Sequence, residues 1–207
     1  WAGVDPATGK GMYYLNNDKT GNAVFNGRSV TYNASNASNI VTGCADPDVY
    51  GGINSSLKWK GVSVDMSFSY SLGGDIYNAF ERYVNDDGYF SNRTRSVKVL
   101  ERWKNPGDIT DVPRYTYEAE YGFFSHTSRW MYKNNYIRLK DISISYTFPE
   151  NIIKKVKMTN LRVFASATNL WTLASQNYFD PEVNAYGVQS WQMPLGKTIT
   201  FGLDFNF

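Results

Sequence analysis

Residues of the types that carry out catalysis occur in this chain, but their spacing builds no catalytic group. His126 is the only histidine among the 207 residues. A hydrolase with a Ser-His-Asp triad would need a nucleophile motif such as Gly-x-Ser-x-Gly, which the sequence lacks. Carboxylate pairs for glycoside hydrolysis can be drawn from four acids, but their spacing is that of ordinary loop acids. Those four are Glu118, Glu120, Asp180 and Glu182. We therefore expect no enzyme activity and an exposed loop position for His126.

Two acidic turns offer oxygen ligands of the kind that calcium prefers. They are Asp46-Pro-Asp48 and Asn85-Asp-Asp-Gly88. Neither has the ligand spacing of an EF-hand, so we predict solvated turns. Cys44 is the only cysteine, which excludes an internal disulfide and a cysteine metal site. The sequence predicts no cofactor.

Aromatic side chains are stronger candidates for binding. The chain holds 16 Tyr, 12 Phe and 6 Trp, which together make 16% of its residues. Tyr and Trp rings stack on sugars, anchor protein partners and line membrane interfaces. The alternative is that they only pack loops together or form the aromatic girdle of a barrel. The predicted contacts with a partner or a substrate are Trp103, Tyr115, Tyr117, Tyr178 and Trp191.

The elements that must position these side chains are strands with one apolar face. In the last eleven residues, the apolar members fall on every second position from Ile199 to Phe207, and small polar residues fill the other positions. Because strand side chains alternate between two faces, this pattern predicts a strand with one dry face. Val62 to Leu72 alternates in the same way, and its other face is almost all serine, which is typical of a watery lumen rather than of a sandwich core. The predicted strands are 53–59, 62–72, 136–148, 161–171 and 197–207.

One of these strands breaks its own alternation. Ile142 and Ile144 share a face, while Ile137 and Leu139 are out of phase with them. Either a bulge lies near Lys140 and the next residue, or the first part of the strand lies above the edge of a membrane.

Connection lengths indicate how the strands are joined. The segments 1–52, 73–135 and 172–196 are long, whereas 60–61 and 149–160 are short, so long and short connections alternate. Outer-membrane barrels have this pattern, with long outer loops and short periplasmic turns. If Phe207 ends on the periplasmic side, both short turns are periplasmic and all three long segments are outer loops. Five strands cannot close a barrel, and an open edge in lipid is costly. We therefore expect all-β, antiparallel strands that are part of a larger transmembrane barrel.

Composition excludes several other classes. The net charge is +2 with no basic run, which argues against a nucleic-acid partner. No apolar run is long enough for a transmembrane helix. The alternative that remains is a secreted β-sandwich that binds or cleaves glycans through its aromatic residues.

Several motifs, taken in order along the chain, resemble the closing region of SusC/RagA-type TonB-dependent outer-membrane transporters. The motifs are Arg102-Trp-Lys-Asn-Pro-Gly107, Asn135-Tyr-Ile-Arg-Leu-Lys-Asp-Ile-Ser-Ile-Ser-Tyr-Thr-Phe-Pro149, Leu161-Arg-Val-Phe-Ala-Ser-Ala-Thr-Asn-Leu170, Asp180-Pro-Glu182, Met193-Pro-Leu195 and Thr200-Phe-Gly-Leu203. Each is weak alone, and the ordered set is fairly specific.

The resemblance implies a 22-stranded barrel filled by a plug domain, of which residues 1–207 are the C-terminal part. The plug and the N-terminal part, which meets the TonB complex, would be absent from this chain. It also implies a multi-pass protein of the bacterial outer membrane that imports glycans or peptides with a SusD-like surface lipoprotein. Phe207, a terminal aromatic residue on an amphipathic strand, would be the signal that the barrel-assembly machinery recognises.

Overall fold

The computed structural model describes residues 1–16, 20–90, 92–117, 126–177 and 179–207. The chain divides into two compact units. We call them the loop unit (1–43, 77–132 and 188–191) and the sheet unit (44–76, 133–187 and 192–207). Among the described residues, no helix has both the length and the apolar character needed to cross a membrane.

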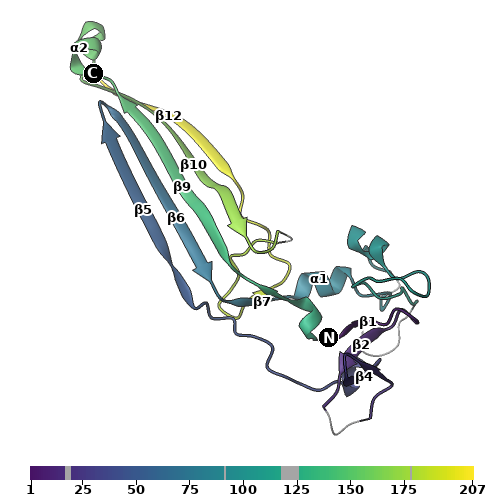
Figure 1. Ribbon diagram of the computed structural model, residues 1–207. Helices are drawn as coiled ribbons and strands as arrows, with labels where there is room; N and C mark the ends of the chain where they lie inside the picture. The colour runs from purple at the N-terminus through teal and green to yellow at the C-terminus, as the bar shows by residue number, and fades with distance from the viewer. Residues whose placement is uncertain (17–19, 91, 118–125, 178) are drawn as a thin grey trace. The chain divides into compact units, whose positions relative to one another are not determined.

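The sheet unit is built on one antiparallel sheet of five long strands, in the order β12-β10-β9-β6-β5 (Figure 1). The all-β prediction is therefore confirmed. Each predicted strand range overlaps one observed strand, and β5 and β10 extend beyond the ranges predicted for them. The bounds are β5 Val49–Trp59, β6 Val62–Leu72, β9 Tyr136–Thr147, β10 Asn160–Ala174 and β12 Thr198–Asn206.

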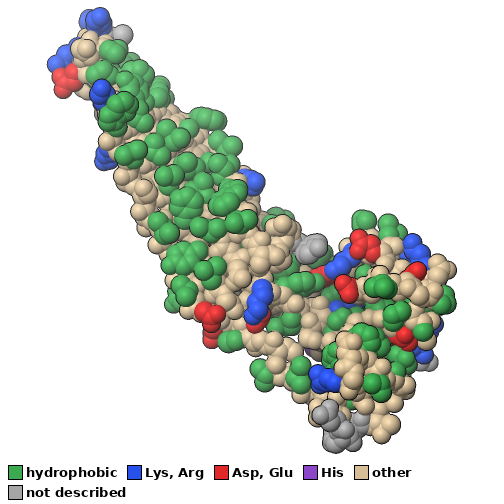
Figure 2. Space-filling model, viewed as in Figure 1, with side chains coloured by type: hydrophobic (Ala, Val, Ile, Leu, Met, Phe, Trp, Pro, Cys, Tyr) green, Lys and Arg blue, Asp and Glu red, His purple; other side chains and the backbone are tan. Residues whose placement is uncertain are grey.

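The register of these strands collects the apolar side chains on one face of the sheet. Ile144 pairs with Val64 on one side and with Ala165 on the other, and Ala165 in turn pairs with Phe201. Because directly paired residues point to the same face, an apolar band crosses the whole sheet. Phe201 is 79% exposed and Ile144, on a central strand, is 48% exposed. Figure 2 shows hydrophobic side chains gathered along the sheet.

A bulge keeps this band continuous. Ser67 pairs with Asp141 and Phe68 with Leu139, so Lys140 on β9 is the unpaired extra residue. The extra residue returns Ile137 and Leu139 to the apolar face, because one added residue inverts the alternation. The predicted bulge is thus confirmed. It is matched by a second irregularity on β10 between Thr168 and Trp171, where Asn169 has φ 52°.

The two short connections and the C-terminal end of β12 lie at the same end of the sheet (Figure 1). Lys60 and Gly61 join β5 to β6, and both have positive φ, as the tightest hairpin turns require. The second connection holds α2 (Glu150–Ile153) and the 3-10 turn η4 (Lys154–Val156). Asn160, at the start of β10, pairs with Asn206, near the end of β12. All longer segments leave from the opposite end.

The loop unit contains most of the remaining short elements. Its first part is a four-stranded antiparallel sheet in the order β1-β2-β4-β3. A short three-stranded sheet, in the order β11-β7-β8, includes the strands through which the chain passes between the units. The bounds are β1 Gly3–Val4, β2 Gly11–Tyr14, β3 Ala23–Phe25, β4 Arg28–Thr31, η1 Ala34–Asn36, β7 Asp75–Asn78, α1 Ala79–Val84, η2 Val97–Glu101, η3 Ser128–Trp130, β8 Met131–Lys133 and β11 Val188–Gln189.

The short helix α1 begins where an asparagine can cap it. The Asn78 side chain accepts a hydrogen bond from the backbone N–H of Glu81 at 2.9 Å, and its amide donates to the Glu81 carboxylate at 3.2 Å. The first bond satisfies one of the free backbone donors of the first turn, and the second joins the two side chains. The helix follows directly on β7, which ends at Asn78.

The loop unit has a core of its own. Met12, Tyr13 and Val30 are at most 3% exposed, and Trp130 is 2% exposed. These side chains come from strands and turns that are distant in the sequence, so the unit is held by tertiary packing rather than by long regular elements.

Candidate functional site

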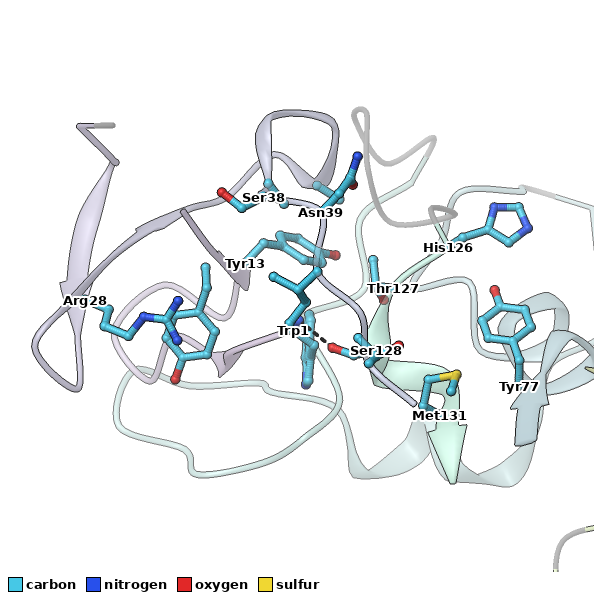
Figure 3. A pocket seen from close by; sticks show the side chains of 15 residues that line it. Trp1, Tyr13, Arg28, Ser38, Asn39, Tyr77, His126, Thr127, Ser128 and Met131 are labelled. Carbon is cyan, nitrogen blue, oxygen red and sulfur yellow. Dashed lines mark hydrogen bonds between the residues drawn. The ribbon is translucent and has the colours of Figure 1, made fainter. Parts of the chain in front are cut away.

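His126 is exposed, as predicted, and lies among groups that do not form a catalytic triad. Its ring stacks on Tyr77 with a centroid distance of 5.6 Å, and Arg82 Nη1 lies 3.1 Å from Nε2 (Figure 3). Partial burial and the Arg82 guanidinium lower the pKa of His126 below its usual value. A catalytic histidine is usually oriented by a carboxylate that stabilises its charged form, and an arginine does the opposite.

The two acidic turns behave differently from each other. Asp46 and Asp48 are exposed, which agrees with the prediction of a solvated turn. The second turn was predicted wrongly, because Asp86 and Asp87 are 0% and 1% exposed. Each is paired with an arginine, Asp86 with Arg95 at 3.1 Å and Asp87 with Arg129. Within the described ranges, no group of three His, Cys, Asp or Glu side chains is placed to hold a metal ion.

Trp103 packs the loop unit internally. Its indole N–H donates to the carbonyl oxygen of Pro6 at 2.9 Å. Its ring lies against Gly9, which has φ 70° and where a Cβ atom would clash with the ring. These contacts favour the packing role over contact with a ligand.

The other predicted contact residues are more accessible. Tyr117 is 67% exposed and Tyr115 is 37% exposed, with the Arg95 guanidinium 4.8 Å from the Tyr115 ring centroid. Trp191 is 68% exposed. Tyr178, Glu118 and Glu120 lie outside the described residues.

Trp191 lies in a hollow of the loop unit that we call the aromatic groove, with a volume of about 670 Å³. The Trp191 ring meets the Phe80 ring edge-on, with centroids 5.0 Å apart, and the Tyr83 ring at 5.5 Å. The groove is lined by Phe80, Tyr83, Val84, Arg93, Thr94, Arg95, Ser96 and Trp191. Of these, sequence reasoning singled out Trp191 alone, because nothing in the local pattern links position 191 to positions 80–96.

A second hollow of the loop unit, of about 620 Å³, is the one drawn in Figure 3. Its walls include Trp1 and Tyr13, which meet edge-on at 5.3 Å, and Tyr14, with the Arg28 guanidinium 4.4 Å from its ring centroid. Burial raises the pKa of the Tyr13 phenol, so that group stays neutral. Its lining also includes polar side chains, among them Ser38, Asn39 and Thr127. A hollow with such walls can bind a planar or ring-shaped group without catalysing a reaction.

In the sheet unit, a set of ion pairs ties the β10–β12 connection to the polar face of the sheet. Arg138 Nη2 donates to Asp180 Oδ1 at 2.7 Å, and Lys140 Nζ donates to Glu182 Oε2 at 2.6 Å. Arg138 Nη1 also lies 3.4 Å from Glu182 Oε2. We call these four residues the acid clasp. The spacing along the chain did not distinguish Asp180 and Glu182 from ordinary loop acids, and the structure places both in ion pairs.

The clasp is more buried at Arg138 and Asp180 than at Lys140 and Glu182. The Arg138 side chain is 4% exposed and that of Asp180 is 11% exposed. Burial acts to raise the pKa of Asp180, but the backbone N–H groups of Leu195 and Glu182, together with Arg138, outweigh it and hold that pKa below its usual value. The clasp is thus a set of charge-assisted bonds that fixes a loop, not a proton-transfer site.

No protein-family model matches the chain. Among curated proteins, it is similar to TonB-dependent receptor P3 of Formosa agariphila, with 28% identity over an alignment of 184 residues that covers 84% of this chain. It is also similar to TonB-dependent receptor P39 of the same organism, with 24% identity over 195 residues and 90% of this chain. The chain spans only 18% and 19% of the length of these two relatives.

The chain is also similar to solved structures. The structure of the RagAB peptide transporter matches all of this chain with a TM-score of 0.79 and 25% identity. The RagAB peptide importer in its 'closed-closed' state shares the fold, with a TM-score of 0.78 and 23% identity. In both cases the chain covers 22% of the matched chain.

Proposed function

We propose that this chain, which is similar to SusC/RagA-type TonB-dependent transporters, forms part of the wall and outer loops of an outer-membrane nutrient importer. The resemblance predicted from the sequence is confirmed by the TonB-dependent receptors and the RagAB structures that the chain matches. Our proposal concerns the activity, the substrates and the partners of the whole transporter.

The observation that carries the proposal is the exposed apolar face of the five-stranded sheet. Soluble proteins rarely expose a contiguous apolar patch larger than a few hundred Å². Here the exposed side chains run from Leu57 on one edge strand to Phe201 on the other, at 64% and 79% exposure. Lipid covers such a face at no cost, because the hydrocarbon layer is as apolar as the side chains.

The alternative, a secreted β-sandwich, needs a second sheet packed on that face. The described residues of the sheet unit form one five-stranded sheet, whose register leaves the outer edges of β5 and β12 without a partner strand. Open edges in lipid leave backbone groups unsatisfied. This supports a larger barrel, which we propose to have 22 strands and a plug supplied by other parts of the same protein.

The positions of the connections support an orientation. We propose that the short turns at 60–61 and 149–160 are periplasmic and that 1–52, 73–135 and 172–196 lie outside the cell, as in outer-membrane barrels generally. Phe207 would then be the assembly signal at the periplasmic end of the last strand.

The proposed importer performs no covalent chemistry and uses no cofactor. Its energy would come from the TonB complex of the inner membrane, and a SusD-like lipoprotein would cover its outer side. RagAB is described as a peptide transporter and importer, so peptides are one substrate class and glycans are the other.

The test uses the full-length transporter with its lipoprotein. We expect it to be extracted from outer membranes only with detergent, to show heat-modifiable gel mobility, and to take up labelled nutrient in cells that hold TonB but not in cells that lack it. Extraction in soluble, monomeric form without detergent would contradict the proposal. For Phe207, the variant Phe207→Ser should lower the amount of folded transporter, whereas Asn206→Ser should not.

A further inference from the structure

We propose that the aromatic groove binds peptides that carry a carboxylate beside an apolar side chain, with Arg93 holding the carboxylate and Trp191 the side chain. This inference rests on the proposed function and narrows its substrate class from peptides or glycans to peptides of this kind.

The first support is the state of Arg93. Its guanidinium lies 3.4 Å from the Phe90 ring centroid and 4.9 Å from that of Tyr83. Among the described residues it has no carboxylate partner. A guanidinium that is stacked on rings keeps its edge N–H groups free, and those groups match a carboxylate in a bidentate geometry.

Arg95, on the same wall, shows the contrast. Its guanidinium is bound to the Asp86 carboxylate at 3.1 Å and also donates to the Phe90 carbonyl oxygen and, at 3.1 Å, to that of Arg93. Arg95 is therefore engaged by the protein. Arg93 is the positive charge that the groove leaves available.

The second support is the way Trp191 is held. Two aromatic rings hold the Trp191 side chain in place. The Phe80 ring lies at an interplanar angle of 88° to the Trp191 ring, and the Tyr83 ring lies at 59° to it. Trp191 lies two residues after the end of β11, which pairs with β7 at Tyr77 and Asn78. A large ring that is fixed in place but still 68% exposed loses little entropy on binding, as is typical of residues that anchor a ligand.

The lining of the groove favours a peptide over a glycan. A sugar brings many hydroxyl groups, and each one that is desolvated without a partner costs affinity. Apart from its two arginines and the Trp191 indole N–H, the polar side-chain groups among the described lining residues are three hydroxyls, those of Tyr83, Thr94 and Ser96. The apolar walls are made by Phe80, Val84, Trp191 and the ring of Tyr83. An aromatic or aliphatic side chain fills such walls well. An uncharged glycan leaves Arg93 unused.

The experiment uses the full-length transporter in detergent and two amidated, fluorescein-labelled peptides, Gly-Phe-Asp-Gly and Gly-Phe-Asn-Gly. We expect the wild-type protein to bind the Asp peptide about tenfold more tightly than the Asn peptide, since charge-assisted bonds contribute more than neutral ones. Arg93→Gln should remove this preference. The control Lys104→Gln removes a positive charge from an exposed side chain outside the groove and should leave the preference unchanged.

Trp191 is tested with the same two probes. Trp191→Ala should weaken both peptides by about tenfold, and Trp191→Phe should restore most of the binding. Fluorescence anisotropy gives the dissociation constants, and the yield of heat-modifiable protein confirms that each variant is folded.

Three outcomes would overturn the inference. They are equal binding of the two peptides by wild-type protein, an unchanged preference in Arg93→Gln, and displacement of the Asp peptide by a trimer of galacturonic acid at lower concentration than by the unlabelled peptide. The last would assign the groove to acidic glycans. If TonB-dependent uptake is intact while the preference is absent, only this inference fails; if the preference holds without such uptake, the proposed function fails.

Discussion

In the loop unit, Met12 and Val30 are 3% and 0% exposed, whereas in the sheet unit Phe201 and Leu203 are 79% and 58% exposed. The loop unit therefore buries its apolar side chains in an ordinary core, as a protein in water must. The sheet unit, with its longer strands, has almost no core. Its apolar side chains face outward in a continuous band, and a surface of this kind needs an apolar solvent rather than water.

The two units also differ in how they use charged side chains. The loop unit buries Asp86 and Asp87 with their arginine partners, and such pairs hold an irregular fold in one conformation. The polar face of the sheet instead carries mainly small hydroxyl groups, with ion pairs gathered in the acid clasp. The comparison teaches that irregular loops need specific polar bonds, whereas long strands are already held by their backbone ladders.

The largest effect is expected from breaking a buried pair in the loop unit. Asp87→Ala leaves Arg129 charged in a site where its side chain is 9% exposed. Removing one partner of a buried pair costs about 3–5 kcal/mol. Hydrogen exchange in the full-length protein should show faster exchange around Met12 and Tyr13, with β9 and β10 unchanged.

The matched control is the exposed pair of Glu150 and Lys154, whose side chains are 76% and 72% exposed. Because surface pairs contribute little, Glu150→Ala should change neither unit. Equal effects from Asp87→Ala and Glu150→Ala would contradict the contrast between buried and exposed pairs.

The next effect concerns the two faces of the sheet. Phe201 and Thr200 are neighbours on β12 that point to opposite faces. Phe201→Arg should destabilise the folded protein in lipid by about 2–4 kcal/mol, because arginine on a lipid face near mid-membrane has that cost. Thr200→Arg should cost much less. Urea titrations in lipid vesicles, followed by tryptophan fluorescence, measure both, and a larger effect at Thr200 would assign the wrong face to lipid.

A smaller and more local effect is expected at the acid clasp. Arg138→Gln removes the cation that Asp180 and Glu182 share. Asp180 keeps its backbone N–H donors and Glu182 keeps Lys140, so we expect a loss of about 1.5–3 kcal/mol, the usual contribution of hydrogen bonds to charged groups. Hydrogen exchange should rise around Glu182 and Leu195. Arg162→Gln is the control, since Arg162 lies on the same face but bonds only to Ser145 Oγ, at 3.2 Å, in the described structure. A global loss of folding in Arg138→Gln would show that the clasp does more than hold the loop.

The smallest effect is the response of the clasp to acid. The pKa of Asp180 in the folded protein is below its usual value of 3.8. Its stabilising contribution is therefore complete above pH 3.8 and is lost as the pH falls through the lower, folded-state pKa. A fluorophore at position 186 (Tyr186→Cys in a Cys44→Ser background) should keep its anisotropy between about pH 7 and 5 and lose it only in stronger acid. Loosening near pH 6 would contradict the bonding of Asp180.

Much of the sheet follows from local pattern, because alternation of side chains is a property of neighbouring residues. The range predicted for β6 agrees with the observed strand, and the break in alternation at Ile137 and Leu139 predicted the bulge. The sites were harder to predict. Trp191 was singled out by residue type, but its partners Phe80, Tyr83 and Arg93 are about a hundred positions away.

The sequence by itself thus determined which segments form the five long strands, which face of each is apolar and how the short turns join them, since these depend on residues within a few positions of each other. Only the tertiary structure decided that Asp86 and Asp87 are buried with arginines, that Asp180 and Glu182 meet Arg138 and Lys140, and that Arg93 and Trp191 line one groove. The reason is physical. Whether a charge is paired or free depends on which distant groups the folded loops bring within bonding distance, and the spacing of residues along the chain does not contain that information.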